Sequence, residues 1–358
     1  MAHARIAALP RALASNPYCE LLSAHLEKLG VEVMDGESSL RWLLRARHRV
    51  RVLHLHWPER HFDPAHVASA AAFILRLLVA RLLGFRLVWT VHNAWPHEGA
   101  TLGSRLVRAA LVRVATLVVH CEAGRAALGS RGRAAHVIPH GSYVGRYPNT
   151  LGTEAARAAL GLPSTARVLL AFGQVRPYKG LDALAAAFAD VPDPAARLVV
   201  AGEPVAGGER ALAGIFDRRV HLCLRRVADG DVQVFFNAAD VVVLPYRSVL
   251  TSGAAMLALS FGRGIVAPRL GCLAELERTG AAILYDPDVP DGLYGALRRA
   301  LAADPSSLGA AARAAVRRLS WDAIARRHLA VYGFAPALTL VRSHPPAGAR
   351  REPAAREG

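Results

Sequence analysis

The chain has 358 residues, of which 53% are hydrophobic and 20% are charged, so it is long enough for two domains with sizeable cores and too apolar to be disordered. It carries 44 Lys and Arg side chains against 28 Asp and Glu, a formal net charge of +16. The first 150 residues hold 19 of the basic and nine of the acidic side chains. This excess favours an anionic partner, such as a phosphate-bearing substrate, an anionic lipid or a nucleic acid.

Targeting and redox signals are weak in this sequence. The N-terminus lacks the apolar core of a signal peptide. The most apolar stretch, 65–85, contains His66, Arg76 and Arg81. Burying each arginine in a bilayer costs about 2.5–3.5 kcal/mol, so we expect a packed, sheet-covering helix there rather than a membrane span. The four cysteines are far apart and form no CxxC motif, which argues against a zinc site or a disulfide framework and fits a reducing compartment. They are Cys19, Cys121, Cys223 and Cys272.

Strand-like and helical segments alternate along almost the whole chain, which predicts an α/β fold of two doubly wound, Rossmann-like parallel sheets with a cleft between them. The first set of predicted strands is 5–9, 31–34, 50–54, 86–90, 116–120 and 136–138. The second set is 167–172, 197–201, 220–224, 240–244, 264–267 and 282–284. Gly, Pro, Asn and Thr cluster at 139–163 and indicate the domain boundary. We therefore expect domains at 1–150 and 151–320, a closing helix at 321–334 and a disordered tail at 335–358.

Polar loops follow three of the predicted strands in the first domain. They are Asn16-Pro17-Tyr18, the segment 54–59 (HLHWPE) and the segment 90–98 (TVHNAWPHE). Ligands of such sheets bind beyond the carboxyl ends of the strands. Aromatic rings can stack on sugars, and a carboxylate or imidazole can accept a proton from a hydroxyl group. A single histidine is more often structural, but two such loops on neighbouring strands favour a sugar site.

The segment 40–49 (LRWLLRARHR) predicts a basic amphipathic helix. Trp42, Leu43 and Ala46 share one helical face, and arginines flank it. This pattern is typical of a helix that docks on an anionic bilayer surface, although an ordinary solvated helix has a similar composition.

Two loops of the second domain are suited to phosphate. The segment 172–180 (FGQVRPYKG) follows a predicted strand and places Gly173, Arg176 and Lys179 at its carboxyl end. Cations there would stabilise the charge that grows on a diphosphate leaving group. The segment 244–253 (LPYRSVLTSG) ends in a helix start rich in Thr, Ser and Gly, whose free N–H groups favour an anion. The alternatives are a basic surface turn and a simple N-cap.

Two further motif types, for metal binding and for nucleotide binding, give no support to a function. Asp229-Gly230-Asp231 and Asp286-Pro287-Asp288 match a metal-binding DxD pattern, but their context is that of loops and helix caps, so we expect no metal. The sequence contains neither GxGxxG nor GxxxxGK[ST], which removes the usual support for dinucleotide or ATP binding.

Taken together and in order, the motifs NPY, LHLHWPE, TVHNAWPHE, FGQVRPYKG and VVLPYRSVLTSGAAMLALSFGRGIVAP (242–268) resemble the GDP-mannose-dependent β-1,4-mannosyltransferases of xanthan-type polysaccharide assembly. The resemblance covers the chain to about residue 330. It implies a GT-B fold, inverting and metal-independent transfer, no cofactor beyond the nucleotide-sugar co-substrate, and a peripheral enzyme on the cytoplasmic face of the cell membrane. The acceptor would be a lipid-linked glycan.

The resemblance also assigns residues. Glu98 and Glu59 become the candidate bases, and His92 would approach the donor sugar. The loop pattern itself adds His56 as a further catalytic candidate. The donor would be bound by residues of both domains, namely Arg176, Lys179, Gly173, Thr251, Ser252, Gly253, Tyr246 and Asn16. The broader retaining GT-B enzymes carry an E-x7-E motif, and here Val249 and Leu257 occupy those places. The carboxylate that usually binds ribose is therefore missing, which leaves the nucleotide open.

Four other functions compete with this interpretation. The first is a transferase that uses a UDP- or TDP-sugar on a lipid or secondary-metabolite acceptor. The second is a sugar-nucleotide epimerase, which would need no acceptor. The third is a catalytically inactive binding protein. The fourth, a nucleic-acid-binding protein, ranks low because the basic residues are scattered without interleaved aromatics, so we expect no nucleic-acid partner.

Overall fold

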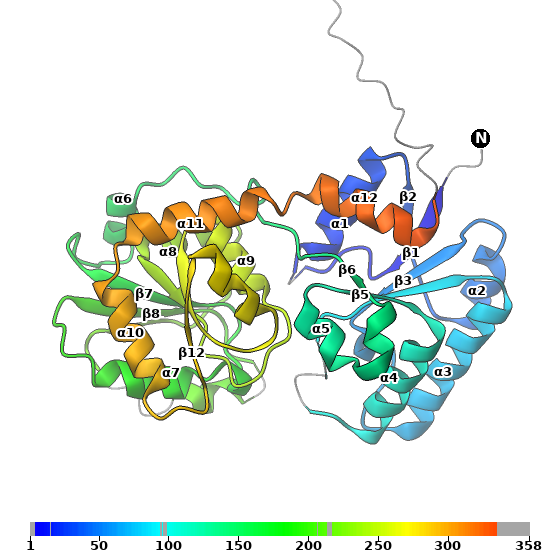
Figure 1. Ribbon diagram of the computed structural model, residues 1–358, viewed down its shortest axis with the longest axis horizontal. Coiled ribbons are helices and arrows are strands. Elements are labelled where there is room, and N and C mark those ends of the chain that lie inside the picture. Colours follow the sequence, from blue (N-terminus) through cyan, green and yellow to red (C-terminus); the bar gives the residue numbers. More distant parts are fainter. Residues whose placement is uncertain are drawn as a thin grey trace, which may run out of the picture.

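The computed structural model describes residues 4–14, 16–93, 95, 99–205, 207–212 and 217–334. Two six-stranded parallel sheets form the molecule, and all twelve strands predicted from the sequence are present, with ends that differ by at most two residues. The predicted α/β fold with two Rossmann-like domains is therefore confirmed (Figure 1). The tail predicted at 335–358 lies outside the described residues.

The strands of the first sheet are β1 (Arg5–Leu9), β2 (Glu32–Asp35), β3 (Val52–His56), β4 (Arg86–Thr90), β5 (Thr116–Val119) and β6 (His136–Val137). Those of the second are β7 (Arg167–Phe172), β8 (Ala196–Ala201), β9 (Val220–Cys223), β10 (Val241–Val243), β11 (Gly264–Pro268) and β12 (Ala282–Tyr285). Their spatial orders are β2-β1-β3-β4-β5-β6 and β12-β11-β10-β7-β8-β9. The order reverses between β1 and β3 in one sheet and between β7 and β10 in the other. These reversal points are where parallel sheets open a binding crevice.

Helices cover both faces of each sheet (Figure 1). The α-helices are α1 (Tyr18–Lys28), α2 (Leu40–Ala46), α3 (Val67–Leu82), α4 (Leu102–Val114), α5 (Glu122–Ala127), α6 (Thr153–Ala159), α7 (Leu181–Ala189), α8 (Val232–Ala238), α9 (Gly253–Ser260), α10 (Gly292–Ala302), α11 (Pro305–Arg317) and α12 (Trp321–Tyr332). The 3-10 helices are η1 (Pro58–Arg60), η2 (Gly129–Ala134), η3 (Pro177–Lys179), η4 (Gly208–Leu212) and η5 (Gly271–Thr279). Within the described ranges, no helix has the length and apolarity needed to cross a bilayer.

Strand alternation divides the buried side chains between the two faces of each sheet. In the first sheet, Leu53 and Leu55 pack under α3, whereas Val52 and Val88 face α1 and α12. The strands are apolar on both faces, as expected for parallel strands covered on both sides.

The chain crosses between the domains twice. After β6 it runs through residues 138–152 into the second domain, and after α11 it returns so that α12 packs on α1 of the first domain. The two crossings meet where Trp321 Nε1 donates to the Ser142 carbonyl at 2.6 Å and Ser142 N donates to the Leu319 carbonyl at 3.0 Å. A Cβ on Gly141 would lie only 2.3 Å from the Trp321 ring, so this close contact requires glycine.

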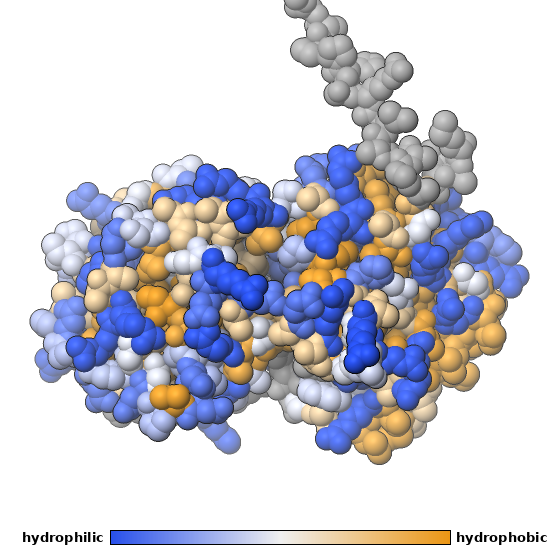
Figure 2. All heavy atoms as spheres, viewed as in Figure 1, coloured by the Kyte–Doolittle hydropathy of each residue, from blue (hydrophilic) through white to orange (hydrophobic). Residues whose placement is uncertain are grey.

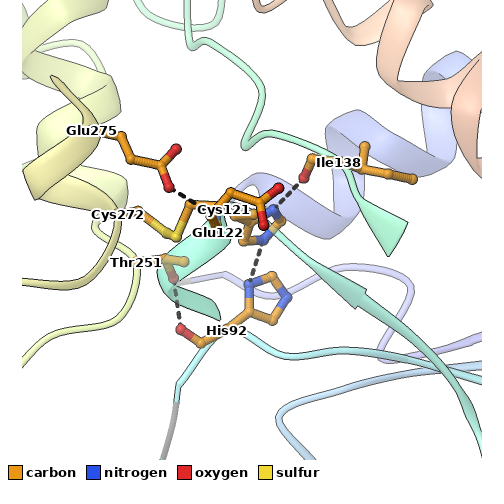
Figure 3. The surroundings of a disulfide bond; sticks show 8 residues. His92, Cys121, Glu122, Ile138, Thr251, Cys272 and Glu275 are labelled. Carbon is orange, nitrogen blue, oxygen red and sulfur yellow. Dashed lines mark hydrogen bonds between the residues drawn. A yellow bond between two sulfur atoms is a disulfide. The ribbon is translucent and has the colours of Figure 1, made fainter. Parts of the chain in front are cut away.

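Cys121 and Cys272 form a disulfide, which corrects the expectation of unpaired cysteines. The two residues are 151 positions apart, and the bond joins the end of β5 to η5 of the other domain (Figure 3). No local motif indicates this pairing, because only the docking of the two domains brings the residues together. Cys19 and Cys223 are free thiols.

The amphipathic face predicted for 40–49 turns inward. Leu43 and Ala46 are buried, and the Trp42 ring stacks on Phe85 with centroids 6.3 Å apart. Our interpretation of this face as a membrane surface was wrong, because the face packs into the core of the first domain.

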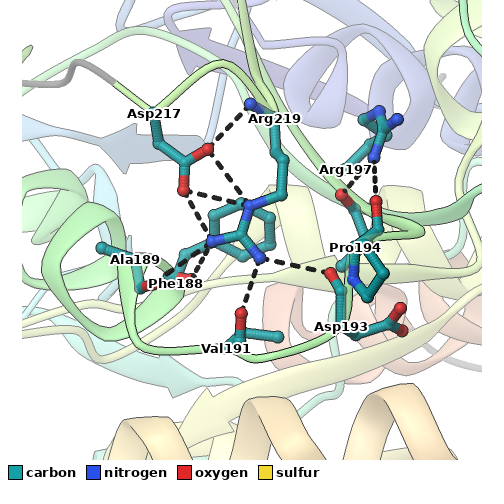
Figure 4. Close-up of polar contacts among 9 residues, drawn as sticks. Phe188, Ala189, Val191, Asp193, Pro194, Arg197, Asp217 and Arg219 are labelled. Carbon is teal, nitrogen blue, oxygen red and sulfur yellow. Dashed lines mark hydrogen bonds and ion pairs between the residues drawn. The ribbon is translucent and has the colours of Figure 1, made fainter.

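Arg219 connects the segment that leads into β9 to the end of α7 in the second domain (Figure 4). Its guanidinium pairs with Asp217 at 2.7 Å and donates to carbonyl oxygens that include that of Val191 at 2.6 Å. It also lies 4.8 Å from the centroid of Phe188. The arginine thereby satisfies carbonyl groups at the end of α7, where a helix leaves acceptors unpaired.

Candidate active site

An open cleft of about 1700 Å³ lies between the two domains, at the reversal points of both sheets. Loops that follow β1, β3 and β4 form one wall, and loops that follow β7 and β10 form the other. Among the site residues proposed from the sequence, those that line the cleft are Asn16, Glu59, His92, Gly173, Arg176, Lys179, Tyr246, Thr251, Ser252 and Gly253. Glu98 lies outside the described residues, and His56 is not part of the lining.

The loop after β7 places two cations in the cleft. Gly173 (φ 101°) and Gly180 (φ 66°) adopt backbone conformations that favour glycine, and a Cβ on Gly180 would lie 2.1 Å from the Pro245 carbonyl oxygen. The turn folds Lys179 back toward Gly173, while Arg176 Nη2 donates to Gln174 Oε1 at 3.3 Å. Burial, and then the charge of Arg176, lower the pKa of Lys179 to about 8. A bound anion would relieve both effects.

The loop after β10 leads into α9, whose N-terminus points to the same cleft. Ser252 is the N-cap, and its Oγ accepts from Ala255 N at 3.1 Å and lies 3.3 Å from the Tyr246 hydroxyl. Thr251 Oγ1 donates to the His92 carbonyl across the interdomain gap at 2.7 Å. A helix start with free N–H groups favours an anion by its partial positive charge. The N-terminus of α9 and the two cations therefore act on one region of the cleft.

Asn16 and the linker support the opposite rim. Asn16 Oδ1 accepts from Tyr18 N at 3.0 Å and from the Tyr143 hydroxyl at 3.2 Å. Tyr143 in turn donates its backbone N–H to Ser260 Oγ at 2.8 Å, on the last turn of α9. The oxygen of Asn16 is thus committed to holding the domains together, so what this residue can offer a ligand is its amide nitrogen.

Trp57 gives the first-domain wall its shape. It is one of two non-glycine residues with positive φ (43°) in the described part of the chain, a conformation that costs energy and is concentrated at functional sites. Its ring stacks on His92 with centroids 4.2 Å apart and an interplanar angle of 13°. Glu59 lies two residues further on in η1 and also faces the cleft. It is the one carboxylate among the described residues of the cleft lining.

His92 belongs to a buried chain of histidines. Its Nε2 lies 3.0 Å from His56 Nδ1, and its Nδ1 lies 3.3 Å from His120 Nε2. His120 Nδ1 is 2.9 Å from the Ile138 carbonyl, which can only accept. Burial lowers the pKa of His56 to about 3 and that of His120 to about 4, and it holds the pKa of His92 well below its ordinary value. All three rings are therefore neutral at pH 7.

The Ile138 carbonyl fixes the proton positions along this chain. Because His120 must donate from Nδ1, its Nε2 accepts from His92 Nδ1. His92 Nε2 then accepts from His56 Nδ1. Both nitrogens of His92 are therefore occupied in the described conformation, and His56, which is 1% exposed, lies behind His92 rather than at the cleft surface.

Several lining residues were missed by the sequence analysis. Tyr143, Tyr147 and His140 come from the linker, for which the sequence predicts only a domain boundary. The aromatic residues and the histidine in this linker are the feature of the sequence that could have indicated its part in the cleft. Trp57, Asn93 and Tyr178 stood within the quoted motifs without a role.

The two DxD matches serve local structure. Asp229 pairs with Arg146 at 3.1 Å, and Asp286 Oδ1 accepts from Asp288 N at 3.0 Å. Across the described ranges, no group of three or more His, Cys, Asp and Glu side chains is arranged to hold a metal ion.

Comparison with known proteins agrees with this architecture. A family model described as "Glycosyl transferases group 1" matches residues 166–303. The GDP-mannose:glycolipid 4-beta-D-mannosyltransferase of Xanthomonas campestris pv. campestris is 31% identical over 302 residues, which cover 81% of each chain.

Solved structures show the same fold. The Anabaena protein HepE in complex with UDP-glucose aligns with a TM-score of 0.73 at 16% identity, over 92% of this chain and 100% of that one. Sucrose-phosphate synthase from Thermosynechococcus elongatus aligns with a TM-score of 0.71 at 18% identity, over 92% and 98% of the two chains. The chain therefore belongs to the GT-B glycosyltransferase family that contains the Xanthomonas mannosyltransferase, and it is a hexosyltransferase.

Proposed function

We propose that this enzyme transfers mannose from GDP-mannose to a glycolipid acceptor, with inversion at the anomeric carbon. The names of the Xanthomonas relatives support the donor and the class of acceptor. The observation that carries the proposal is the division of charge across the cleft. Arg176, Lys179 and the start of α9 form a cationic wall, and Glu59 faces them from the other domain.

This division suits a single displacement. Glu59 accepts the proton of the acceptor hydroxyl, and the resulting oxygen bonds to the anomeric carbon from the face opposite the diphosphate. The bond from that carbon to the diphosphate oxygen breaks in the same step, and GDP leaves with the electron pair. Arg176, Lys179 and the N-terminus of α9 stabilise the charge on this leaving group. Glu98 remains the second candidate for the base.

In this proposal His92 orients rather than removes a proton. Its two nitrogens are engaged by His56 and His120, and its ring supports Trp57. Its backbone carbonyl holds Thr251 of the donor wall. The proposed roles of His92 and His56 are thus to set the position of Trp57 and the spacing of the two walls.

We propose that transfer needs neither a metal ion nor a further cofactor, because two side-chain cations and a helix N-terminus already act where the diphosphate charge grows. Full transfer activity in the presence of EDTA is the expected result. Loss of activity that Mg²⁺ or Mn²⁺ restores would overturn this part of the proposal.

The decisive experiment is a panel of GDP-, UDP- and TDP-sugars, measured by thermal shift and by transfer. A ligand at 100 times its dissociation constant stabilises the folded state by about 2.7 kcal/mol. Stabilisation and transfer with GDP-mannose, but not with the others, would support the proposal. A response to UDP-sugars alone would replace it.

A UDP- or TDP-sugar donor is the second candidate, because the residues of the cleft leave the choice of nucleotide open. Val249 and Leu257 line the cleft at the places where retaining relatives have two glutamates. These side chains offer no acceptor for ribose hydroxyls, so the nucleotide must be recognised by other groups. The panel distinguishes the two donors directly.

We further propose that the enzyme binds peripherally to the cytoplasmic face of the membrane through the outer face of α3 and α4. This leucine face consists of Leu75, Leu78 and Leu82 on α3 and Leu102 and Leu106 on α4, with exposed fractions between 40% and 86%. The two helices pack side by side, and apolar residues gather over this region in Figure 2. Such an apolar area on a soluble surface marks an interaction site.

Charge complementarity supports an anionic bilayer as the partner of the leucine face. Arg81, Arg105 and Arg113 are exposed on the same two helices, and each basic residue near an anionic surface contributes about 1 kcal/mol. We expect the enzyme to float with phosphatidylglycerol vesicles, and the pair L78E/L82E to abolish flotation. V289E, which changes a similarly exposed residue of the second domain, is the control. Equal flotation of the wild type, L78E/L82E and V289E would show that the leucine face does not bind the membrane.

A further inference from the structure

A tyrosine of the linker, Tyr143, lies alongside α9 in the second domain. Its backbone N–H donates to Ser260 Oγ at 2.8 Å, at the last residue of this helix. Its hydroxyl lies near the other end, because a Cβ added to Gly253, the first residue of α9, would be 3.3 Å from that oxygen. The residue is 5% exposed and belongs to the core of the second domain. Tyr143 therefore keeps its place relative to α9.

The hydroxyl of Tyr143 forms a bond to the first domain. It donates to Asn16 Oδ1 at 3.2 Å, in the loop that follows β1. His140 Nε2 lies further away, at 3.5 Å, so Asn16 is the nearer acceptor. Close by, Thr251 Oγ1 donates to the His92 carbonyl at 2.7 Å. Two hydrogen bonds thus connect the surroundings of the α9 N-terminus to the first domain.

The backbone of Tyr18 fixes which end of the Asn16 amide faces the protein. Tyr18 N can only donate, and it lies 3.0 Å from the amide, so the end that faces it is the oxygen. The same oxygen accepts from the Tyr143 hydroxyl. The amide nitrogen, Nδ2, takes the other position, and among the described residues none accepts a hydrogen bond from it.

Asn16 lines the same cleft as the cationic wall. The described lining also includes Arg176, Lys179, Ser252 and Gly253. A diphosphate carries several non-bridging oxygens, each of which can accept hydrogen bonds, and it can therefore bind groups of both domains at once. The amide nitrogen of Asn16 is a neutral hydrogen-bond donor that the first domain contributes to this region.

We propose that Tyr143 is a positioning residue for the nucleotide sugar. It holds the Asn16 amide so that Nδ2 donates to a non-bridging oxygen of the diphosphate, which Arg176 and Lys179 bind from the second domain. The inference rests on the proposed function, because it takes the cationic wall to hold the diphosphate. It adds a role for the linker, since one of its side chains sets the contact between the first domain and the leaving group.

The contribution of Tyr143 follows from the freedom of the Asn16 side chain. With Tyr18 N alone, the amide would have one anchor, and ligand binding would have to restrict its remaining motion at a cost in affinity. The second anchor removes that motion and ties the amide to the position of α9. A contact made equally in the ground state and in the transition state changes KM rather than kcat. We therefore expect loss of the Tyr143 hydroxyl to act on KM.

Calorimetric titration with inorganic pyrophosphate tests the contact itself, because GDP-, UDP- and TDP-sugars share this group. N16D retains an oxygen that accepts from Tyr18 N and from the Tyr143 hydroxyl, but it replaces Nδ2 by a second, negatively charged oxygen. We expect N16D to weaken pyrophosphate binding by about tenfold or more at an unchanged melting temperature. Wild-type affinity in N16D would overturn the proposal.

Y143F tests the positioning role, because it removes the hydroxyl and retains the buried ring. We expect about fivefold weaker pyrophosphate binding and a similar rise in KM for the nucleotide sugar, with kcat changed by less than about twofold. Y285F changes a buried tyrosine of the second domain that is not among the described residues of the cleft lining, and it should behave like the wild type. Unchanged affinity in Y143F, or a fall in kcat at constant KM, would contradict the positioning role.

A double-mutant cycle shows whether Tyr143 acts through Asn16. N16A removes the amide, so Y143F should weaken pyrophosphate binding no further in the N16A background. Additive losses would contradict the proposal, because Tyr143 would then support the cleft independently of Asn16.

The same titration with R176A and K179A separates this inference from the proposed function. If these two variants lose pyrophosphate binding while N16D and Y143F retain it, the positioning role fails and the cationic wall stands. If the wild type does not bind pyrophosphate, the cationic wall fails and the inference fails with it. A UDP-sugar as the substrate would replace GDP-mannose and leave the roles of Asn16 and Tyr143 unchanged.

Discussion

The disulfide between Cys121 and Cys272 ties the end of β5 to η5 of the other domain. The neighbouring backbone reinforces the link, because Glu122 N donates to Glu275 Oε1 at 2.8 Å across the same interface (Figure 3). Leu250, which precedes Thr251, is buried in the core of the first domain. One side of the cleft is therefore closed by a covalent bond, a hydrogen bond and a buried leucine.

We expect reduction of this disulfide to lower the stability of the enzyme. A bond that closes a loop of this length restricts the unfolded chain, and removal of such bonds typically costs about 2–4 kcal/mol. C272S should therefore melt at a lower temperature than the oxidised wild type, and dithiothreitol should bring the wild type to the same value. C223S, which removes a free thiol, is the control. Identical melting of the wild type with and without reductant would contradict this expectation.

Arg176 and Lys179 should each be needed for turnover. Loss of one group that stabilises leaving-group charge typically lowers kcat by about 100-fold or more. We therefore expect R176A and K179A to reduce kcat by that factor, while the melting temperature changes little. K28A removes an exposed lysine of α1 and should transfer at the wild-type rate. Near-normal rates in both cleft variants would refute the assignment of the donor wall.

The pKa of Lys179 predicts an alkaline limit to donor use. Because this pKa is about 8 in the free enzyme, the ammonium form is complete well below pH 8 and is lost as the pH rises through that value. We expect kcat/KM for the donor to fall about tenfold per pH unit above pH 8. K179R keeps its charge throughout this range, so its kcat/KM should not fall above pH 8. The same fall of kcat/KM above pH 8 in K179R would show that another group causes it.

Glu59 and Glu98 can be separated by substitution. A general base typically contributes about 10²–10⁴-fold to the rate. We expect E59Q to lower kcat by such a factor while the donor dissociation constant is unchanged, and E98Q to have a smaller effect. The measurement is single-turnover transfer at saturating donor. The reverse ranking would assign the base to Glu98.

The buried histidines should make the enzyme sensitive to acid. Burial lowers the pKa of each member of the group, which comprises His54, His56, His92, His120, His140 and His328. Below pH 6.5 the unfolded chain binds protons that the folded one excludes, so stability falls by up to about 1.4 kcal/mol per pH unit for each histidine. We expect the melting temperature to drop steeply from pH 7 to pH 5, and H140N to flatten the slope. A constant melting temperature over this range would show that the histidines are not excluded from protonation.

The class of fold and the loops that form the cleft could be predicted from the amino-acid sequence. Runs such as Arg167–Phe172 are apolar on both faces, and only a covered parallel strand suits them. Glycines and cations directly after such a strand, as at Gly173 and Lys179, indicate a phosphate loop because parallel strands direct their carboxyl ends to one edge. Local pattern was sufficient for these features, since each depends on residues close together in the chain.

Which side chains come into contact across the molecule depends on how the two domains fold and dock. The pairing of Cys121 with Cys272, the hydrogen bond from Thr251 to His92 and the tautomers along the histidine chain all join segments distant in sequence. The helix at 40–49 shows the same limit, because its amphipathic pattern is satisfied equally by a bilayer and by a protein core. Packing of the domain, which no local pattern encodes, turned Leu43 into the core and left the leucines of α3 and α4 outside.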